Sequence, residues 1–254
     1  MRKSQNVPGV LIVAGSFAGK GGLQRRLSDL AGSLSAHHQV TVLTWMARAR
    51  PRSELRPDGV RVVVVPSILD WGSDHHPVAA ALNTLFSVTT GVTAALLLRS
   101  RWSVACAAGL QPEGTVAALA ARGPRKFVIM TWMAGRLGNA ERLRRSVAAR
   151  FVLRRIRRAR WFIAETPDAA AELVELGLPP DRVRSLIVGV DLHRFRPRQH
   201  AVRARLRGGR LAVYTGRFDL RHKRLDLLLE AWAAATLPGW RLVLAGAGHR
   251  PAGA

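Results

Sequence analysis

The chain has few acidic residues and almost no lysine. Aspartate and glutamate account for 16 of its 254 residues, lysine and arginine for 40, and lysine stands only at positions 3, 20, 126 and 223. The formal charge at pH 7 is therefore +24, carried nearly all by arginine. This imbalance favours anionic partners: nucleic acid, phosphorylated small molecules or an anionic membrane.

Cysteine is nearly absent, since Cys106 is the single one. One cysteine excludes an intrachain disulfide framework and is typical of a reducing compartment, so we expect a cytoplasmic protein. Cys106 lies in the apolar stretch SVACAAG, which favours a place in the core over a role as nucleophile. The sequence also lacks histidine and cysteine clusters with metal-ligand spacing, so we expect neither a metal nor another cofactor.

Long hydrophobic runs are scarce as well. The first residues, MRKSQNVPGVLIVAGSF, are basic, but their apolar run is short and ends in a glycine turn, so they do not predict a signal peptide. The longest apolar stretch, 78–98, contains Asn83, Ser87 and Gly91. We interpret it as a buried or amphipathic helix rather than a membrane span.

Strand-like and helix-like segments alternate along the chain. The predicted strands are 10–14, 40–44, 60–65, 103–107, 127–130, 161–164 and a last one in VRSLIVG; the predicted helices are 23–34, 78–99, 114–122, 143–158 and 167–176. This alternation predicts an α/β protein with a parallel sheet and helices on both faces. Thr166, Pro167 and Asp168 form a strong helix start, because a hydroxyl cap is followed by proline at the first helical position.

A second cycle begins at Arg210. RLAVYTG and WRLVLAG are predicted strands that end in glycine, and KRLDLLLEAWAAA between them is a predicted helix. One β-α-β unit is too small to bury its own faces, so we expect Val213, Leu228, Leu229 and Val243 to stay partly exposed. The predicted organisation is a Rossmann-like domain over 1–190, a connector over 191–208, and an incomplete second Rossmann-like domain over 209–254.

A glycine-rich turn, GSFAGKGG, follows the first predicted strand and precedes a helix. Backbone N–H groups and the positive end of the helix dipole meet there, which suits an anion. A Walker A loop is not formed, because only three residues separate Gly15 from Gly19 and Gly21 replaces the hydroxyl residue that would bind magnesium. Two interpretations stay open: a phosphate site, or glycines at 21 and 22 that only allow tight packing of strand and helix.

Four sequence motifs follow one another along the chain: GGLQRRLSDLAGSLSAHHQVTVLTW, VGVDLHRFRP, TGRFDLRHKRLDLLLEAWA and LVLAGAGHRP. Together they resemble the GT-B-fold glycosyltransferases of family 4, the glycogen-synthase-like retaining group. The first is similar to that family's opening, and the second to its junction signature N-G-V-D-x-x-x-F-x-P. The third is similar to the donor signature G-R-(x)-K-G-(x)-L-L-x-A, and the fourth to a strand with its G-x-G-P loop.

The resemblance implies transfer of a sugar, with retention and without a metal, from a nucleotide-diphosphate donor to a glycan, lipid-linked or cell-envelope acceptor. Arg217 and Lys223 are then the catalytic residues, which grip the diphosphate and stabilise the leaving group. A guanidinium can hold phosphate oxygens bidentately, and a lysine adds a point charge. The donor and phosphate-binding residues that the resemblance implies are Gly21, Gly22, Gly216, Arg217, Lys223, Gly246 and Gly248.

The chain departs from the family pattern at several places. Val188 stands where the junction has asparagine, Arg224 replaces the glycine after the donor lysine, and residues 130–139 contain no histidine. The family's paired-glutamate motif beyond the G-x-G-P loop is absent from the sequence. We therefore expect a truncated second domain and little activity of this chain alone. The alternatives are a non-catalytic remnant and a basic α/β protein that binds nucleic acid.

An arginine-rich segment runs from Arg142 to Arg160, with Leu143, Val147 and Phe151 as a narrow apolar stripe. It can be a helix that covers the sheet and presents a solvated arginine face. It can also bind an anionic membrane from the cytoplasmic side, which would suit a lipid-linked acceptor. Nucleic-acid binding is the least favoured reading, because there is no RNA or DNA motif and no aromatic stacking platform among the arginines.

Overall fold

The computed structural model describes residues 9–17, 21–69, 76–122, 126–131, 147–187, 189–193, 195–196, 210–218, 220 and 223–246. The chain divides into two compact units, Met1–Gly189 and Val190–Ala254, each with its own sheet. Most of the connector predicted over 191–208 lies outside the described residues, so the predicted domain limits stay a prediction.

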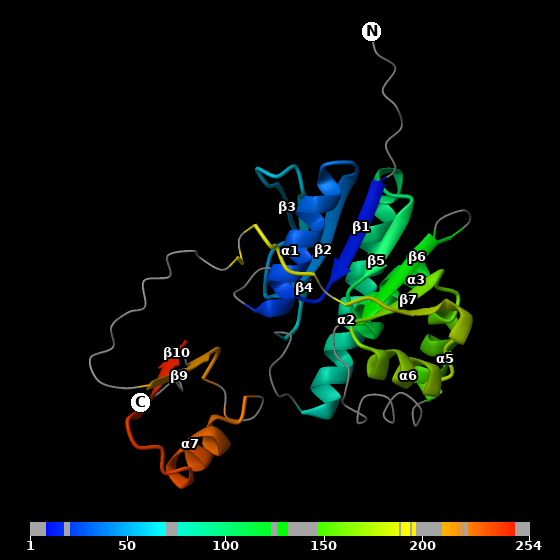
Figure 1. The fold of residues 1–254 in the computed structure, drawn as a ribbon. Helices are drawn as coiled ribbons and strands as arrows, with labels where there is room; N and C mark the ends of the chain where they lie inside the picture. The colour runs from blue at the N-terminus through cyan, green and yellow to red at the C-terminus, as the bar shows by residue number, and fades with distance from the viewer. Residues whose placement is uncertain are drawn as a thin grey trace. The chain divides into compact units, whose positions relative to one another are not determined.

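In the described part of the first unit, eight strands form one sheet in the order β3-β4-β2-β1-β5-β6-β7-β8 (Figure 1). Only β3 with β4 is antiparallel among these neighbours; the other pairs are parallel. The strands are β1 (Gly9–Ala14), β2 (Gln39–Ala47), β3 (Arg52–Leu55), β4 (Arg61–Ser67), β5 (Val104–Ala107), β6 (Lys126–Thr131), β7 (Trp161–Ala164) and β8 (Val183–Ser185).

β1 lies at the centre of this sheet because its side chains are apolar on both faces. Leu11, Ile12 and Val13 are fully buried, and β1 pairs with β2 on one side and β5 on the other. Parallel strands that are covered on both faces appear as continuous apolar runs, as VLIVA does here. Because β1 is parallel to both β2 and β5, the carboxyl ends of these three strands lie at one edge of the sheet. The strand order also reverses at β1. In such sheets that edge is where ligands bind.

Helices lie on both faces of the sheet (Figure 1). On one face, Leu27 and Ala31 of α1 pack against a cluster that includes Ile12, Val42 and Val62. The core on the other face contains residues of α2, α3, α5 and α6. The helices are α1 (Gly22–Ser35), α2 (Pro77–Leu97), α3 (Thr115–Ala120), α5 (Val147–Ile156) and α6 (Pro167–Glu175), with short turns η1 (Arg99–Arg101), η2 (Leu110–Gly114) and η3 (Pro180–Arg182). The predicted α/β class with a parallel, Rossmann-like sheet is confirmed.

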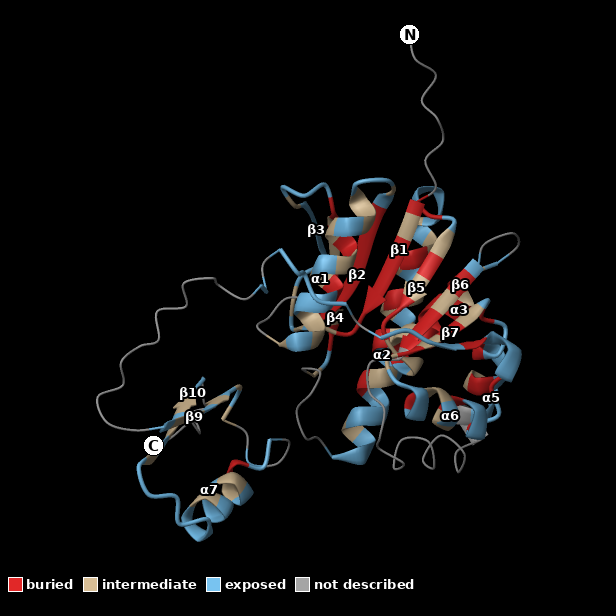
Figure 2. Ribbon diagram, in the orientation of Figure 1, coloured by how far each residue is buried: buried red, intermediate tan, exposed pale blue. Residues whose placement is uncertain are grey.

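α2 packs into the first unit through a narrow stripe. The buried residues of this stripe recur every four positions and are Asn83, Ser87, Gly91 and Ala95. The indole Nε1 of Trp45 donates a hydrogen bond to the Ser87 carbonyl at 2.9 Å. Within the described residues, α2 alone is long and apolar enough to cross a membrane by length and composition. Its first half is largely exposed (Figure 2), and the exposed large side chains there are Val78, Leu82, Leu85 and Phe86.

Several local predictions are confirmed and others are corrected. The Thr166 hydroxyl accepts a hydrogen bond from the Ala169 N–H at 3.1 Å, so α6 has the predicted cap. The strand β3 was not predicted, because RSEL is a polar edge strand with every residue exposed. The helix predicted over 143–158 appears as Val147–Ile156, and 143–146 lies outside the described residues.

The second unit contains β9 (Arg210–Thr215), α7 (Leu225–Ala234) and β10 (Trp240–Ala245). β9 and β10 pair in parallel, with Val213 opposite Val243. These two valines and Leu229 are 54%, 44% and 49% exposed, and Leu228 is partly buried. The predicted exposure of this unit's apolar residues is confirmed. The physical reason is that the described part of the unit has too few elements to cover them.

A substitution at Gly91 tests how closely α2 packs on the sheet. A methyl group there would lie 2.5 Å from Cζ2 of Trp45 and 2.9 Å from Cγ2 of Val116. Gly91→Ala is therefore expected to lower the free energy of unfolding by about 1–3 kcal/mol through overpacking. Gly32→Ala is the matched control, because its methyl group in α1 has no neighbour closer than 3.8 Å. It is expected to raise stability by up to about 1 kcal/mol through helix propensity. Urea unfolding measures both, and equal effects would contradict this packing.

Candidate functional site at the carboxyl edge of the sheet

The glycine-rich turn places the start of α1 at the carboxyl end of β1. Gly21 occupies the cap position with φ −81° and ψ 159°, and no side chain caps the helix. The first turn of α1 contains no acidic residue. The first N–H groups of a helix have no partner within the helix, and the dipole gives this end a partial positive charge. The start of α1 is therefore suited to a negatively charged group.

Packing does not explain the glycine pair. A Cβ atom at Gly22 would meet nothing within 4 Å, and one at Gly21 would meet the end of the Gln24 side chain, which is flexible. Both φ angles fall outside the left-handed region that favours glycine. The sequence left two interpretations open, a phosphate site or tight packing of strand and helix. Among the described residues there is no tight packing at Gly21 and Gly22, and the space beside Gly22 is open.

Glu113 connects this turn to the loop after β5. Its Oε1 accepts a hydrogen bond from the Gly15 N–H at 2.9 Å, across 98 positions of sequence. Its Oε2 is withdrawn from solvent and has no hydrogen-bond partner among the described residues. Burial raises the pKa of Glu113 to about 7, and the hydrogen bonds from the backbone N–H groups of Glu113 and Gly15 lower it only in part. Glu113 is not among the residues predicted from the sequence, although it is a lone acid in the stretch GLQPEGTV.

A second long-range contact also lies at this edge. The Arg26 guanidinium in α1 forms an ion pair with the carboxylate of Glu165, the residue directly after β7. The two residues are 139 positions apart in sequence. Together with the bond from Gly15 to Glu113, this pair ties the β1–α1 segment to the carboxyl ends of strands on the other side of β1.

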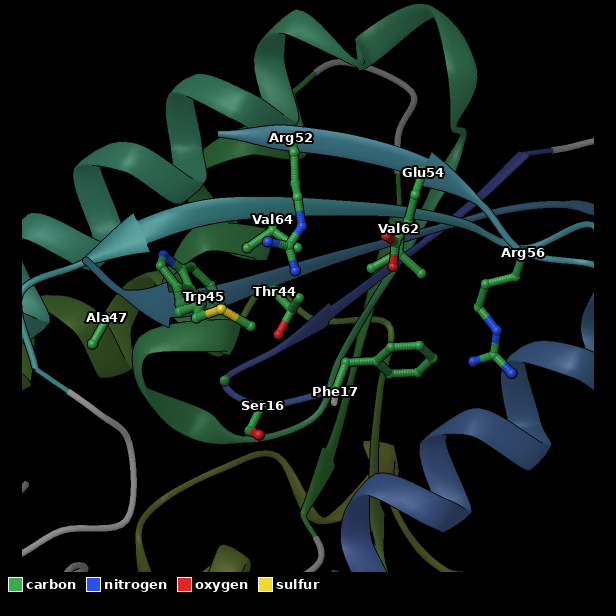
Figure 3. A pocket seen from close by; sticks show the side chains of 12 residues that line it. Ser16, Phe17, Thr44, Trp45, Ala47, Arg52, Glu54, Arg56, Val62 and Val64 are labelled. Carbon is green, nitrogen blue, oxygen red and sulfur yellow. The ribbon is translucent and has the colours of Figure 1, made fainter. Parts of the chain in front are cut away.

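A pocket of about 400 Å³ opens beside the same turn (Figure 3). Its walls come from the end of β1 and the following turn, the end of β2, the middle of β4, and β3 with the residue after it. The lining residues are Gly15, Ser16, Phe17, Thr44, Trp45, Met46, Ala47, Arg52, Glu54, Arg56, Val62 and Val64. Volumes of this size are ordinary for small-molecule sites. This pocket was not predicted from the sequence, because its polar wall is β3, a strand that no sequence pattern indicated.

Of the predicted donor residues, Gly216 and Arg217 follow β9, Gly246 follows β10 and Lys223 precedes α7 in the second unit, whereas Gly21 and Gly22 belong to the first unit. The Tyr214 hydroxyl donates a hydrogen bond to the Arg217 carbonyl at 2.9 Å, which fixes the turn after β9. Gly246 must be glycine, because a Cβ atom there would collide with the Gly216 carbonyl oxygen. Arg217 and Lys223 are both exposed, after β9 and before α7 respectively. Gly248 lies outside the described residues, and no observation tests the predicted roles.

The conformation of Arg224 shows why the family signature has glycine at this position. The residue adopts the left-handed conformation, φ 47° and ψ 51°, just before α7 begins. This region favours glycine, which is the residue of the family signature at this position. The guanidinium pairs with Asp226, with Nη2 to Oδ2 at 3.0 Å, and this contact holds the pKa of Asp226 below its usual range. The positive charge of Arg224 is thus compensated by the carboxylate of Asp226.

The remaining candidate groups have structural explanations. Burial raises the pKa of the Cys106 thiol to about 12, which favours the protonated thiol at neutral pH. Among the described residues, no group of three or more histidine, cysteine, aspartate or glutamate side chains could hold a metal ion. In α5, Leu153 and Ile156 are buried, whereas Phe151 is 56% exposed beside Arg155. The arginines 150, 154 and 155 are also exposed, so α5 covers the sheet with one face and presents a basic face to solvent.

Comparison with solved structures defines the class of fold. The sucrose-phosphate synthase of Thermosynechococcus elongatus is 18% identical with a TM-score of 0.66, and 93% of this chain covers 62% of that one. Anabaena HepE in complex with UDP and glucose is 17% identical with a TM-score of 0.65, covering 95% of this chain and 62% of that one. The UDP-forming trehalose-phosphate synthase of Burkholderia vietnamiensis is 12% identical with a TM-score of 0.65, over 96% and 66% of the two chains. The architecture is therefore of the GT-B type, and the chain spans about 62% of the length of the first two proteins.

The family follows from the sequence of the first unit. The model of the glycosyl transferase 4-like domain matches residues 21–189, more than half of the chain. The chain thus belongs to the glycosyl transferase 4-like domain family. No curated protein matches it. The predicted resemblance to family 4 glycosyltransferases is confirmed at this level.

The buried carboxyl of Glu113 predicts a pH-dependent stability. Its pKa is raised from 4.5 to about 7, so the folded state favours the neutral acid. No penalty exists below pH 4.5; it grows as the pH rises and is complete above about pH 7, where it reaches about 3 kcal/mol. Glu113→Gln keeps an acceptor for Gly15 but does not titrate. Its free energy of unfolding should therefore exceed that of the unsubstituted chain by more at pH 8 than at pH 4. Urea unfolding at both pH values measures the difference, and a pH-independent difference would contradict the assignment.

Proposed function

We propose that the protein transfers a sugar from a nucleotide-diphosphate donor to an acceptor, with retention of configuration at the anomeric carbon. The observation that carries this proposal is the family match over residues 21–189. The solved neighbours support the donor class, because HepE is described in complexes with UDP-glucose and with UDP and glucose. The proposal concerns the activity of the whole protein, since this chain spans only part of those proteins' length.

In this proposal the second unit stabilises charge on the donor. Arg217 and Lys223 bind the diphosphate, and their positive charges stabilise the leaving nucleoside diphosphate as the glycosidic bond breaks. Both side chains are exposed at strand–helix junctions, so a ligand can reach them. The backbone at Gly216 and Gly246 can approach the phosphates closely, because neither residue carries a side chain. No metal is needed for this chemistry, since the two cations neutralise the diphosphate.

The first unit contributes an open helix N-terminus. The uncapped start of α1 at Gly21 and Gly22 offers backbone N–H groups to an anion. We propose that these groups bind a phosphate oxygen of the donor or a polar group of the acceptor. Glu113 supports this role, because its hydrogen bond to Gly15 holds the turn that leads into the helix.

We further propose that the protein works at the cytoplasmic face of an anionic membrane, on a lipid-linked acceptor or another envelope glycan. The basic face of α5 is exposed and continues into Arg157, Arg158 and Arg160. Exposed Phe151 stands among these arginines, and an aromatic side chain beside cationic ones is typical of helices at the membrane interface. The surplus of positive charge would draw such a surface to anionic lipid.

Donor binding tests the first proposal. We expect at least one member of a panel of UDP-, ADP- and GDP-sugars to bind the purified chain in calorimetric titrations. Arg217→Ala and Lys223→Ala should each weaken that binding by about tenfold, because each removes a charge-assisted contact to phosphate. Arg241→Ala is the matched control, since Arg241 is an exposed arginine on β10 outside the proposed site. Binding unaffected by both variants, or absent for every donor, would contradict the assignment.

Vesicle sedimentation tests the membrane proposal. The protein should sediment with vesicles rich in phosphatidylglycerol, and salt should release it because exposed charges are screened. Replacing Arg154, Arg155, Arg157 and Arg158 with glutamine should abolish sedimentation. A control with the same loss of charge replaces the exposed arginines 48, 50, 99 and 101. Equal loss in both variants would indicate a general charge effect and contradict a role for α5, as would equal binding to neutral vesicles.

A further inference from the structure

The pocket beside the β1–α1 turn presents an ordered row of side chains across three strands. Thr44 of β2 is opposite Val64 of β4, and Val64 is opposite Arg52 of β3. Two pairs further along, Val62 is opposite Glu54. Residues two apart on a strand share a face, so Arg52 and Glu54 project from β3 toward the same side. Figure 3 shows both side chains pointing into the pocket over Thr44, Val62 and Val64.

Three polar groups in this row are available to a ligand. Thr44 is 4% exposed, and its hydroxyl has no hydrogen-bond partner within the described part of the chain. Arg52 and Glu54 are exposed, and neither side chain forms a hydrogen bond or an ion pair with a described residue. A buried hydroxyl without a partner costs free energy, because it has lost water and gained nothing in return. A ligand in the pocket would restore that hydrogen bond.

The third charged side chain, Arg56, already has its partners. Its Nη2 lies 2.9 Å from the Asp58 carboxylate, and its Nη1 donates to the Ser28 hydroxyl of α1 at 3.0 Å. Its guanidinium also lies 5.5 Å from the centre of the Phe17 ring. Arg56 therefore closes one end of the pocket and connects β3 to α1 and to the β1–α1 turn, and its charge is compensated by Asp58.

Among the described residues that line the pocket the charges consequently balance, although the chain as a whole carries +24. Arg52 and Glu54 have opposite signs, and Arg56 is neutralised by Asp58. A site for phosphate or another anion would have an excess of cations and no carboxylate facing the ligand. A carboxylate that accepts hydrogen bonds, a guanidinium that donates them and a hydroxyl that does both match the hydroxyl groups of a neutral sugar. The apolar surface of Val62 and Val64 can contact the C–H groups of its ring.

We propose that this pocket binds an uncharged sugar ring of the acceptor, with Glu54 and Arg52 on neighbouring hydroxyl groups and Thr44 on a third. This inference rests on the proposed glycosyl transfer and specifies its acceptor as a neutral carbohydrate. Gly15 belongs both to the pocket and to the turn that Glu113 holds, so a sugar bound here lies beside the residues that follow β1. Arg52, Glu54 and Thr44 are thus specificity-determining residues of the acceptor site.

Saturation-transfer NMR with the full 254-residue chain tests this proposal. The probes are glucose, galactose, mannose and N-acetylglucosamine, each compared with its charged partner glucose 6-phosphate or glucuronate. At least one neutral sugar should receive saturation from the protein and should not be displaced by equimolar charged sugar. Arg52→Ala and Glu54→Gln should each weaken its affinity about tenfold or more, because each removes a hydrogen bond to a charged group.

Arg61→Ala is the matched control, because Arg61 is an arginine of the neighbouring strand β4 that does not line the pocket. Its side chain donates a hydrogen bond to the hydroxyl of Ser53, which lies between Arg52 and Glu54 on β3. The Arg61→Ala variant should bind the sugar with unchanged affinity, and thermal unfolding should show that all three variants remain folded. Three outcomes would overturn the proposal: no neutral sugar binds, the charged sugars bind more tightly, or the Arg52 and Glu54 variants bind as well as the control. Nucleotide-sugar binding by the same variants separates the two claims. Intact donor binding without sugar binding leaves the proposed function standing and removes only the acceptor pocket.

Discussion

The parallel pairing of β1 with β2 and with β5 is the constraint on which the site depends. Parallel strands end at a common edge, so three loops that are distant in sequence meet where the strand order reverses. The hydrogen bond from Gly15 to Glu113 and the ion pair of Arg26 with Glu165 then fix the position of the first turn and of α1. Without that edge the adjoining pocket would not exist, because it takes residues from several strands.

The distribution of charge separates two kinds of surface in one very basic chain. Arginines on the exposed face of α5 stay solvated, and their sum creates a long-range field that attracts anions. Inside the pocket the charges compensate one another, since Arg56 pairs with Asp58 and Arg52 stands beside Glu54. The net charge of +24 therefore affects the attraction of a partner over long range more than the chemistry inside this pocket.

Local conformation in the second unit accounts for two features of the family signature. Gly246 is needed because the backbones at the ends of β9 and β10 approach too closely for a side chain. Arg224 adopts a left-handed conformation at the place where the signature has glycine, and its ion pair with Asp226 helps to hold it there. The stretch that resembles the donor signature thus sets a backbone path around Arg217 and Lys223 in addition to carrying their charges.

What the sequence by itself determined was the alternation of strands and helices, the parallel α/β class, the cap at Thr166 and the family. These follow from local periodicity, from turn chemistry and from short motifs, all of which act within a few residues. It did not reveal β3, because a polar edge strand has no apolar pattern, and so it missed the wall of the pocket that carries Arg52 and Glu54. Only the tertiary structure decided that Glu113 binds Gly15 and that Thr44, Arg52 and Glu54 share one pocket. The physical reason is that these groups meet through strand order and register, which are set by packing of the whole sheet rather than by any local stretch of the chain.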